Sequence, residues 1–122
     1  MIQIDYKSDK PIYEQIIQQF KLNIVKGIFK EGDKVISVRK MASILDITPS
    51  TVSKAYAELE RQGVIETIRA KGTYIAGSGL QAQDISMEKV RKNLLDELIE
   101  LKHAGVGLEQ VQSLVRELYD SI

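Results

Sequence analysis

Hydroxyl and basic side chains gather at three places between residues 37 and 72. Two places are the starts of short helical patterns and the third is the turn of a predicted hairpin; together they hold Ser37, Arg39, Ser50, Thr51, Ser53, Lys54, Arg69, Lys71 and Gly72. Hydroxyl, lysine and arginine side chains bind phosphate oxygens, and lysine or arginine also binds the O6 and N7 atoms of guanine. The chemistry predicted for this set is therefore nucleic-acid binding.

Two amphipathic helices must position the first two groups. Apolar residues recur at i, i+3, i+4 and i+7 in both helices: Val38, Met41, Ala42 and Leu45, then Val52, Ala55, Tyr56 and Leu59. Such spacing buries one face of each helix. Ser37 and Thr48 are placed to cap the two helices, and Pro49 suits the first turn of the second. Asp46–Ile47 is expected to break the first helix, and Gly63 to end the second.

The outward face of the second helix carries the groups that would touch DNA. With the apolar face inward, Ser50, Lys54 and Ala57 point most directly outward, and Thr51 and Ser53 flank them. In a helix-turn-helix the second helix enters the major groove with its N-terminal residues at the base edges. Lys54 can reach a phosphate or a guanine, and the free N–H groups near Ser50 favour a phosphate.

A hairpin with a basic turn follows the two helices. Strands are predicted over residues 64–69 and 73–76, so that Arg69 and Lys71 meet at the tip and Gly72 gives the backbone room. A basic wing of this kind can enter a minor groove. Two helices followed by such a hairpin indicate a winged helix-turn-helix, a fold that is mostly α with a small β-hairpin (α+β).

Each of these groups also has an ordinary structural explanation. Serine and threonine at a helix start usually cap it, a single exposed lysine or arginine is usually solvated, and a basic turn often protects a sheet edge. Arg39 lies near a helix N-terminus, where the dipole mildly disfavours a basic residue and a bound anion would relieve this. Tyr56 is expected in the core, with a hydroxyl at the rim that could reach a phosphate. Because three elements carry compatible chemistry, DNA binding is the preferred interpretation.

The remaining segments divide the chain in two. Residues 1–10 are predicted to form an extended arm, and Pro11 to begin a helix that Gly27 ends. Its apolar stripe is Ile12, Ile16, Phe20 and Ile24. Val35–Ile36 is a candidate short strand. Gly77-Ser78-Gly79 is the only clear linker. We therefore predict a DNA-binding domain over residues 1–76 and a short two-helix tail over residues 77–122.

The tail is predicted to be a helix capped by Ser86, a turn at Gly105 and Gly107, and a last helix. One apolar stripe of the first helix can pack on the last: Met87, Val90, Leu94, Leu98 and Leu101. Leu95 and Ile99 fall on another side and need the DNA-binding domain or a second subunit as a partner. Two helices cannot bury much core alone, so dimerisation is favoured over packing within one chain. The predicted dimer contacts are Leu95, Ile99, Leu114 and Leu118.

Composition narrows the function classes. The net formal charge is zero, but residues 1–76 carry 12 Lys/Arg against 9 Asp/Glu and residues 77–122 carry 5 against 8. With no cysteine, no signal-like segment and no membrane-length apolar run, a cytoplasmic protein without membrane contact is expected. His103, the single histidine, is expected to be solvated or favoured by the helix dipole. No nucleophile–base pair, phosphate loop or catalytic carboxylate pair is evident, so no enzyme, metal or cofactor is predicted.

Four segments carry a family resemblance: PIYEQI at 11–16, GDKVISVRKMA at 32–42, TPSTVSKAYAELERQGVI at 48–65 and RAKGTYI at 69–75. With these motifs and spacings the chain resembles the GntR family of bacterial transcription regulators, in particular its short YtrA-like branch. The resemblance implies a homodimeric repressor of a palindromic operator that regulates its own operon and a linked transporter. It also implies DNA contacts by Arg39, Gly72 and the polar start of the second helix, here Thr48, Ser50, Thr51, Ser53 and Lys54.

Two positions depart from the family pattern. Ile36 stands where proline usually precedes the SVR motif, which loosens the turn before Arg39. Ala70 stands where the wing usually has its first glycine, and its Cβ could keep the wing from the minor groove. The rival function is a winged helix that binds a protein through the same face. The outward hydroxyls and Lys54 favour DNA, because a protein interface prefers aromatic or apolar anchors. A small-molecule effector, at a dimer interface or between tail and wing, is left open.

Overall fold

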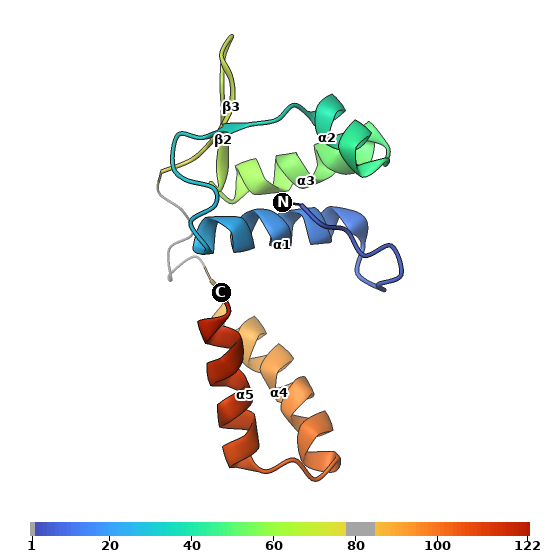
Figure 1. Cartoon of the computed structure of the whole chain (residues 1–122), viewed down its shortest axis with the longest axis vertical. Helices are drawn as coiled ribbons and strands as arrows, with labels where there is room; N and C mark the ends of the chain where they lie inside the picture. The colour runs from blue at the N-terminus through green and yellow to red at the C-terminus, as the bar shows by residue number, and fades with distance from the viewer. Residues whose placement is uncertain (1, 78–84) are drawn as a thin grey trace. The chain divides into compact units, whose positions relative to one another are not determined.

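The computed structural model describes residues 2–77 and 85–122. These residues form five α-helices and one three-stranded antiparallel sheet, and the chain divides into two compact units, Met1–Leu80 and Gln81–Ile122 (Figure 1). This confirms the predicted α+β class. Of the predicted linker only Gly77 is described, and Ser78 and Gly79 lie outside the described residues.

The first unit is built around α1 (Ile12–Val25), which runs beside α3 (Figure 1). Its predicted apolar stripe is confirmed, since Ile16 and Phe20 are fully buried and the stripe's ends are half-buried. Pro11 is the residue before the helix rather than its first residue. Gly27, at φ 76°, follows the helix end in the left-handed conformation that glycine favours.

Helix α1 also buries two polar side chains that apolar periodicity does not reveal, Gln15 and Asn23. The Gln15 amide accepts from the Asp5 N–H and donates to the Asp5 and Lys10 carbonyls. The arm was expected to be extended through residue 10. Instead it bends after Asp5 and folds over the start of α1. The Tyr6 hydroxyl then donates to the Leu45 carbonyl, which ties the arm to the end of the next helix.

The helix-turn-helix consists of α2 (Val38–Leu45) and α3 (Pro49–Arg61). As predicted, the Ser37 hydroxyl caps α2 by accepting the Lys40 N–H at 3.2 Å. Asp46 ends α2 in the left-handed conformation at φ 53°. Thr48 occupies the N-cap position of α3 as predicted, but its side chain accepts no backbone N–H of α3 and bonds to neighbouring hydroxyls instead.

The wing belongs to a sheet with the order β1-β3-β2, formed by β1 (Lys34–Val35), β2 (Ile65–Ile68) and β3 (Gly72–Ile75). In the hairpin Ile65 pairs with Ile75 and Ile68 with Gly72. The strand predicted at Val35–Ile36 begins one residue earlier, and its pairing with β3 was not predicted. Strand β3 pairs with β1, which precedes α2, on one side and with β2, which follows α3, on the other. Both pairings anchor the wing to the helix-turn-helix.

The second unit consists of α4 (Met87–His103) and α5 (Leu108–Asp120). Ser86 caps α4 as predicted, by accepting the Lys89 N–H. Neither helix contains a buried residue. The stripe of α4 expected to pack on α5 is only partly covered within a single chain: Leu101 is half-buried, whereas Leu94 is 55% exposed and Leu98 42%. Within the described ranges no helix has the length and apolarity needed to cross a membrane.

Candidate nucleic-acid interface

The start of α3 presents the hydroxyl and basic side chains predicted to touch DNA. Val52 and Leu59 are fully buried, which leaves Ser50, Ser53 and Lys54 exposed on the opposite side. The Thr48 hydroxyl lies 3.2 Å from that of Ser50 and 2.9 Å from that of Thr51, which is half-buried. These hydroxyls form a linked cluster. Pro49 has no N–H and the Thr51 N–H donates to the Thr48 carbonyl at 3.1 Å, so among the first three residues of α3 the Ser50 N–H keeps its hydrogen-bonding capacity for another acceptor.

Lys54 does not extend straight into solvent from this face. Its Nζ atom lies 3.9 Å from the centroid of the Tyr13 ring on α1, which is cation–π distance. The Tyr13 hydroxyl donates to Glu14 Oε1 at 3.3 Å, and the negative charge of Glu14 raises the pKa of Tyr13. Sequence reasoning missed Tyr13, because only the packing of α1 on α3 brings residues 13 and 54 together.

Tyr56 belongs to the core and is 8% exposed. Its hydroxyl donates to the Ile36 carbonyl at 2.8 Å, and burial raises its pKa. The suggestion that this hydroxyl reaches a phosphate is therefore not supported, because it is already bonded inside the protein. The same bond fixes the turn before Ser37, so Ile36 in place of proline does not leave that turn without support.

The first turn of α2 carries the exposed Arg39 side chain. Among the described residues Arg39 has no ion-pair partner, so its guanidinium keeps its five N–H donors available. Ser37 uses its oxygen as the acceptor for the cap, which leaves its hydroxyl hydrogen free to donate.

At the wing, Arg69 and Lys71 are exposed on either side of Ala70. Ala70 has φ 67°, a left-handed conformation that is unfavourable for a residue with a Cβ. Gly72 has φ 124°, and a Cβ there would lie 3.1 Å from Lys34 Cε. The tip therefore needs glycine at 72 and keeps a glycine-like backbone at 70 although the residue is alanine.

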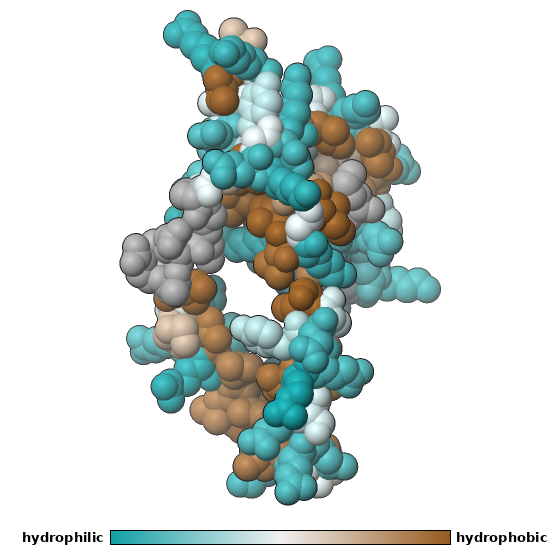
Figure 2. Space-filling view, turned by 60° about the vertical axis from the view of Figure 1, so that its left-hand side comes forward, coloured by the Kyte–Doolittle hydropathy of each residue, from teal (hydrophilic) through white to brown (hydrophobic). Residues whose placement is uncertain are grey.

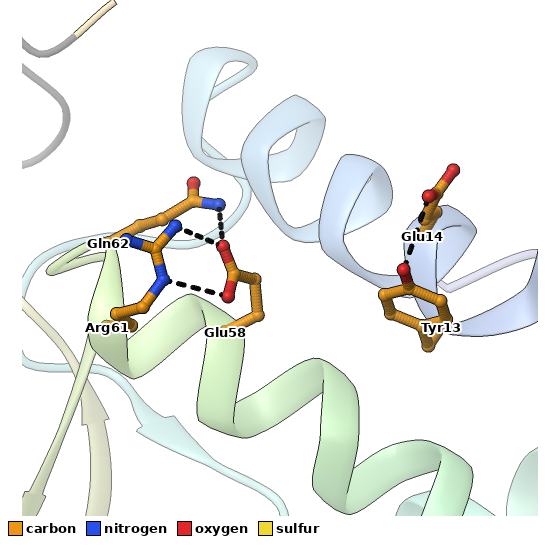
Figure 3. A network of polar contacts seen from close by, with 5 residues as sticks. All are labelled: Tyr13, Glu14, Glu58, Arg61 and Gln62. Carbon is orange, nitrogen blue, oxygen red and sulfur yellow. Dashed lines mark hydrogen bonds and ion pairs between the residues drawn. The ribbon is translucent and has the colours of Figure 1, made fainter.

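An ionic cluster lies farther along α3, shown in Figure 3. Arg61 donates to both carboxylate oxygens of Glu58, at 2.9 and 2.5 Å, and Gln62 donates to the same carboxylate at 2.9 Å. These hydrogen bonds, from Arg61 first, lower the pKa of Glu58 from its ordinary value of 4.5 to about 2. Sequence reasoning missed this cluster, although the i, i+3 and i, i+4 spacing on a helix indicates such contacts.

No group of three or more His, Cys, Asp or Glu in the described part of the chain is arranged to hold a metal ion. The interface offers hydroxyl, ammonium, guanidinium and backbone N–H donors. The arrangement can bind an anionic polymer and supplies no nucleophile with an adjacent base.

Comparison with known proteins places these features in a family. Residues 12–75 match the family described as "Bacterial regulatory proteins, gntR family". The chain is 48% identical over 119 residues to the "HTH-type transcriptional repressor YtrA" of Bacillus subtilis (strain 168), covering 97% of this chain and 92% of that protein.

Two solved structures extend the similarity to nearly the whole chain. A "Transcriptional Antiterminator from Listeria monocytogenes EGD-e" is 41% identical with a TM-score of 0.85, covering 98% of this chain and 90% of that one. YtrA from Sulfolobus acidocaldarius, "a GntR-family transcription factor", is 30% identical with a TM-score of 0.57, covering 99% and 98%.

Proposed function

The chain belongs to the gntR family of bacterial regulatory proteins, and from this premise we propose that it is a homodimeric transcriptional repressor that binds a palindromic DNA operator. Membership in this family of regulators agrees with the prediction that the chain is not an enzyme. The name of the B. subtilis relative supports repression rather than activation. Regulation of its own operon and a linked transporter, in the cytoplasm where the DNA lies, is part of the same proposal.

One observation carries the proposal: the start of α3 is a polar, basic surface on a helix whose other side is firmly packed. Val52 and Leu59 are fully buried, and α2 and α1 both pack against α3. Ser50, Ser53 and Lys54 remain exposed at the end of the helix that a helix-turn-helix inserts into the major groove. Ser37, Arg39, Thr48, Thr51 and the wing residues Arg69, Lys71 and Gly72 complete the proposed contact set.

A protein partner on the same face is less well supported. Interfaces between proteins are anchored by aromatic, methionine and arginine side chains and contain few lysines in their cores. The exposed start of α3 offers hydroxyls and Lys54, and Tyr13 is covered on its face by that lysine. This composition suits a phosphate backbone better than an apolar docking site.

Duplex RNA is the alternative nucleic-acid ligand for a surface of hydroxyl and basic side chains, because its backbone carries the same phosphates. An A-form RNA duplex has a deep, narrow major groove that side chains cannot read, whereas the B-DNA major groove admits an α-helix. The helix-turn-helix of this chain therefore favours DNA. A duplex RNA of the operator sequence is the matching competitor in the binding experiment described below.

Dimerisation is proposed for the tail, residues 77–122, and DNA binding for residues 1–76. Apolar side chains gather over the surface of α4 and α5, as Figure 2 shows. Leu95 and Ile99 are each 54% exposed, Leu114 41% and Leu118 56%. An apolar surface of this extent is characteristic of an interface, and a two-fold dimer matches a two-fold operator.

The proposal includes a small-molecule effector without identifying it. In the first unit a cavity of about 70 Å³ lies among Phe20, Phe29 and Met41. Its walls are mostly apolar, so an effector at this place would have to be a compact apolar molecule.

The test is a mobility shift with the chain's own upstream region, repeated over a salt series. Specific binding should weaken steeply with salt, because phosphate contacts release counterions. Arg39→Ala should weaken the free energy of DNA binding by about 1–3 kcal/mol if Arg39 contacts a base edge. Lys26→Met, at the far end of α1, is the control for loss of one positive charge. Unchanged affinity in Arg39→Ala would remove Arg39 from the interface, and equal affinity for the RNA duplex would contradict DNA as the ligand.

A further inference from the structure

Lys54 is the exposed basic residue of α3 that the structure holds against another helix. Its ammonium lies 3.9 Å from the centroid of the Tyr13 ring, within the roughly 6 Å range of a cation–π contact. Tyr13 is in the first turn of α1, and Lys54 is in the first half of α3. The contact therefore joins the helix that supports the interface to the helix proposed to enter the groove.

The Tyr13 ring is itself held in place. It is half-buried and contributes to the apolar surface around the core, and its hydroxyl donates to Glu14 Oε1 at 3.3 Å. Figure 3 shows Tyr13 and Glu14 together on α1. The charge of Glu14 raises the pKa of Tyr13 most, and that of Glu58 on α3 adds to the increase, which places the Tyr13 hydroxyl within electrostatic range of α3. A fixed ring can orient a lysine that would otherwise sample many rotamers in solvent.

The direction of Lys54 matters for what it can contact. In a recognition helix, the outward face at the N-terminal end, here called the crown, faces the base edges. The sides of the helix face the groove walls, which are lined by phosphates. A lysine folded toward α1 leaves the crown, where Ser50 and Ser53 are exposed, and lies at the side. Only one side of an ammonium faces the ring, so its other N–H groups can still donate.

We propose that Tyr13 is a positioning residue for DNA binding: its ring holds Lys54 at the α1 side of the recognition helix, where Lys54 contacts a backbone phosphate rather than a base. The inference rests on the proposed DNA binding. It makes Lys54 a contributor to affinity for any sequence and leaves sequence reading to the other residues at the start of α3 and to Arg39.

The experiment measures fluorescence anisotropy of the full chain with an upstream-region duplex and a scrambled duplex, between 50 and 200 mM salt. Lys54→Met should weaken binding to both duplexes by the same factor. It should also reduce the slope of log affinity against log salt by about 0.9 for each phosphate that the protein no longer neutralises. Tyr13→Leu should weaken binding about two- to fivefold, and Tyr13→Phe, which keeps the ring, should restore it.

A double variant and a matched control separate positioning from general damage. In the Lys54→Met background, Tyr13→Leu should have no further effect, because the two residues act through one contact. Lys26→Met removes a positive charge at the other end of α1 and should leave the salt slope almost unchanged. A weakening by Tyr13→Leu that persists in the Lys54→Met background would overturn the positioning role. A weakening by Lys54→Met that is confined to the upstream-region duplex and absent from the scrambled duplex would overturn the phosphate contact.

A measurement on the free protein covers the case in which Tyr13→Leu does not fold. The Hε protons of Lys54 should show an upfield ring-current shift by NMR in the wild type and in Tyr13→Phe. Normal shifts in both would overturn the proposal without any DNA experiment. Failure of the wild type to bind DNA would overturn the proposed function as well, whereas wild-type binding with an unaffected Tyr13→Leu would overturn this inference alone.

Discussion

At the scale of single residues, the wing tip shows how one backbone conformation accommodates an unfavourable side chain. Ala70 adopts φ 67°, a region that costs an L-residue roughly 1–2 kcal/mol and glycine little. The surrounding hairpin holds it there through the β2–β3 pairing on both sides of the turn. The family-like glycine is therefore missing from position 70 while its conformation is retained.

Ala70→Gly should relieve this strain. We expect the free energy of unfolding to rise by about 0.5–1 kcal/mol, because the relief of the left-handed strain exceeds the added entropy of an unfolded glycine. Urea denaturation at a fixed protein concentration measures the change. Gly72→Ala is the opposite case: φ 124° and a Cβ placed 3.1 Å from Lys34 Cε should make it destabilising. A less stable Ala70→Gly would contradict the strain argument.

Glu58 provides a residue-scale prediction for pH. Its folded pKa of about 2 lies below the ordinary 4.5, so the contribution of its hydrogen bonds to stability is present above pH 4.5. That contribution should disappear as the pH falls from about 4.5 to about 2. An NMR titration of the side-chain carboxyl should give the low value in the wild type and a higher one in Arg61→Met. A wild-type titration near 4.5 would show that the Arg61 contact does not persist in solution.

Sequence patterns predicted single residues well where burial is periodic and poorly where contacts cross between elements. The buried faces that include Val52 and Leu59 follow from helical spacing alone. The buried Gln15 was not predictable, because its hydrogen-bond partners lie in the arm, which folds back over α1. The contact of Lys54 with Tyr13 was missed for the same reason.

At the scale of elements, the predicted order of helices and hairpin is confirmed, whereas the pairing of β1 with β3 was not foreseen. A two-residue strand has no periodicity, so only the completed hairpin shows where it pairs. The two helix starts also differ in a way that the sequence hides. Ser37 and Thr48 both precede a helix, but only Ser37 accepts a backbone N–H of the helix that follows it.

This difference predicts unequal costs for the two alanine variants. Ser37→Ala should lower the free energy of unfolding by about 1 kcal/mol, since it removes a side-chain cap. Thr48→Ala should cost less than about 0.5 kcal/mol, because its hydroxyl bonds only to other hydroxyls near the surface. Urea denaturation of both variants at the same concentration gives the comparison. Equal costs would mean that Thr48 caps α3 in solution.

At the scale of the whole molecule, the two units differ in charge and in exposed apolar surface. The positive excess lies in residues 1–76 and the negative excess in residues 77–122, although the net charge is zero. The sequence identified the apolar faces of the tail, but the face assigned to packing between α4 and α5 is only partly covered in a single chain. Periodicity tells which side of a helix is apolar and not what covers it. Because neither helix has a buried residue, these faces favour a partner outside the tail.

We propose that the partner of these apolar faces is a second copy of the chain. Light scattering at micromolar concentration should give the mass of a dimer for the wild type and of a monomer for the double variant Leu95→Glu/Ile99→Glu. Both residues are 54% exposed in the single chain, so the substitutions should leave the fold of the subunit intact. Dimerisation would then have to bury two charges per subunit, which is unfavourable. Asn93→Glu, on the polar side of α4, is the control and should remain dimeric.

Binding to a duplex with two half-sites should fall by roughly 10²–10⁴ in the monomeric variant, because the second contact is no longer intramolecular. Its affinity should then match that for a single half-site, which separates loss of pairing from loss of the DNA interface. A wild type that is monomeric, or a double variant that binds both duplexes like the wild type, would contradict dimerisation through the tail.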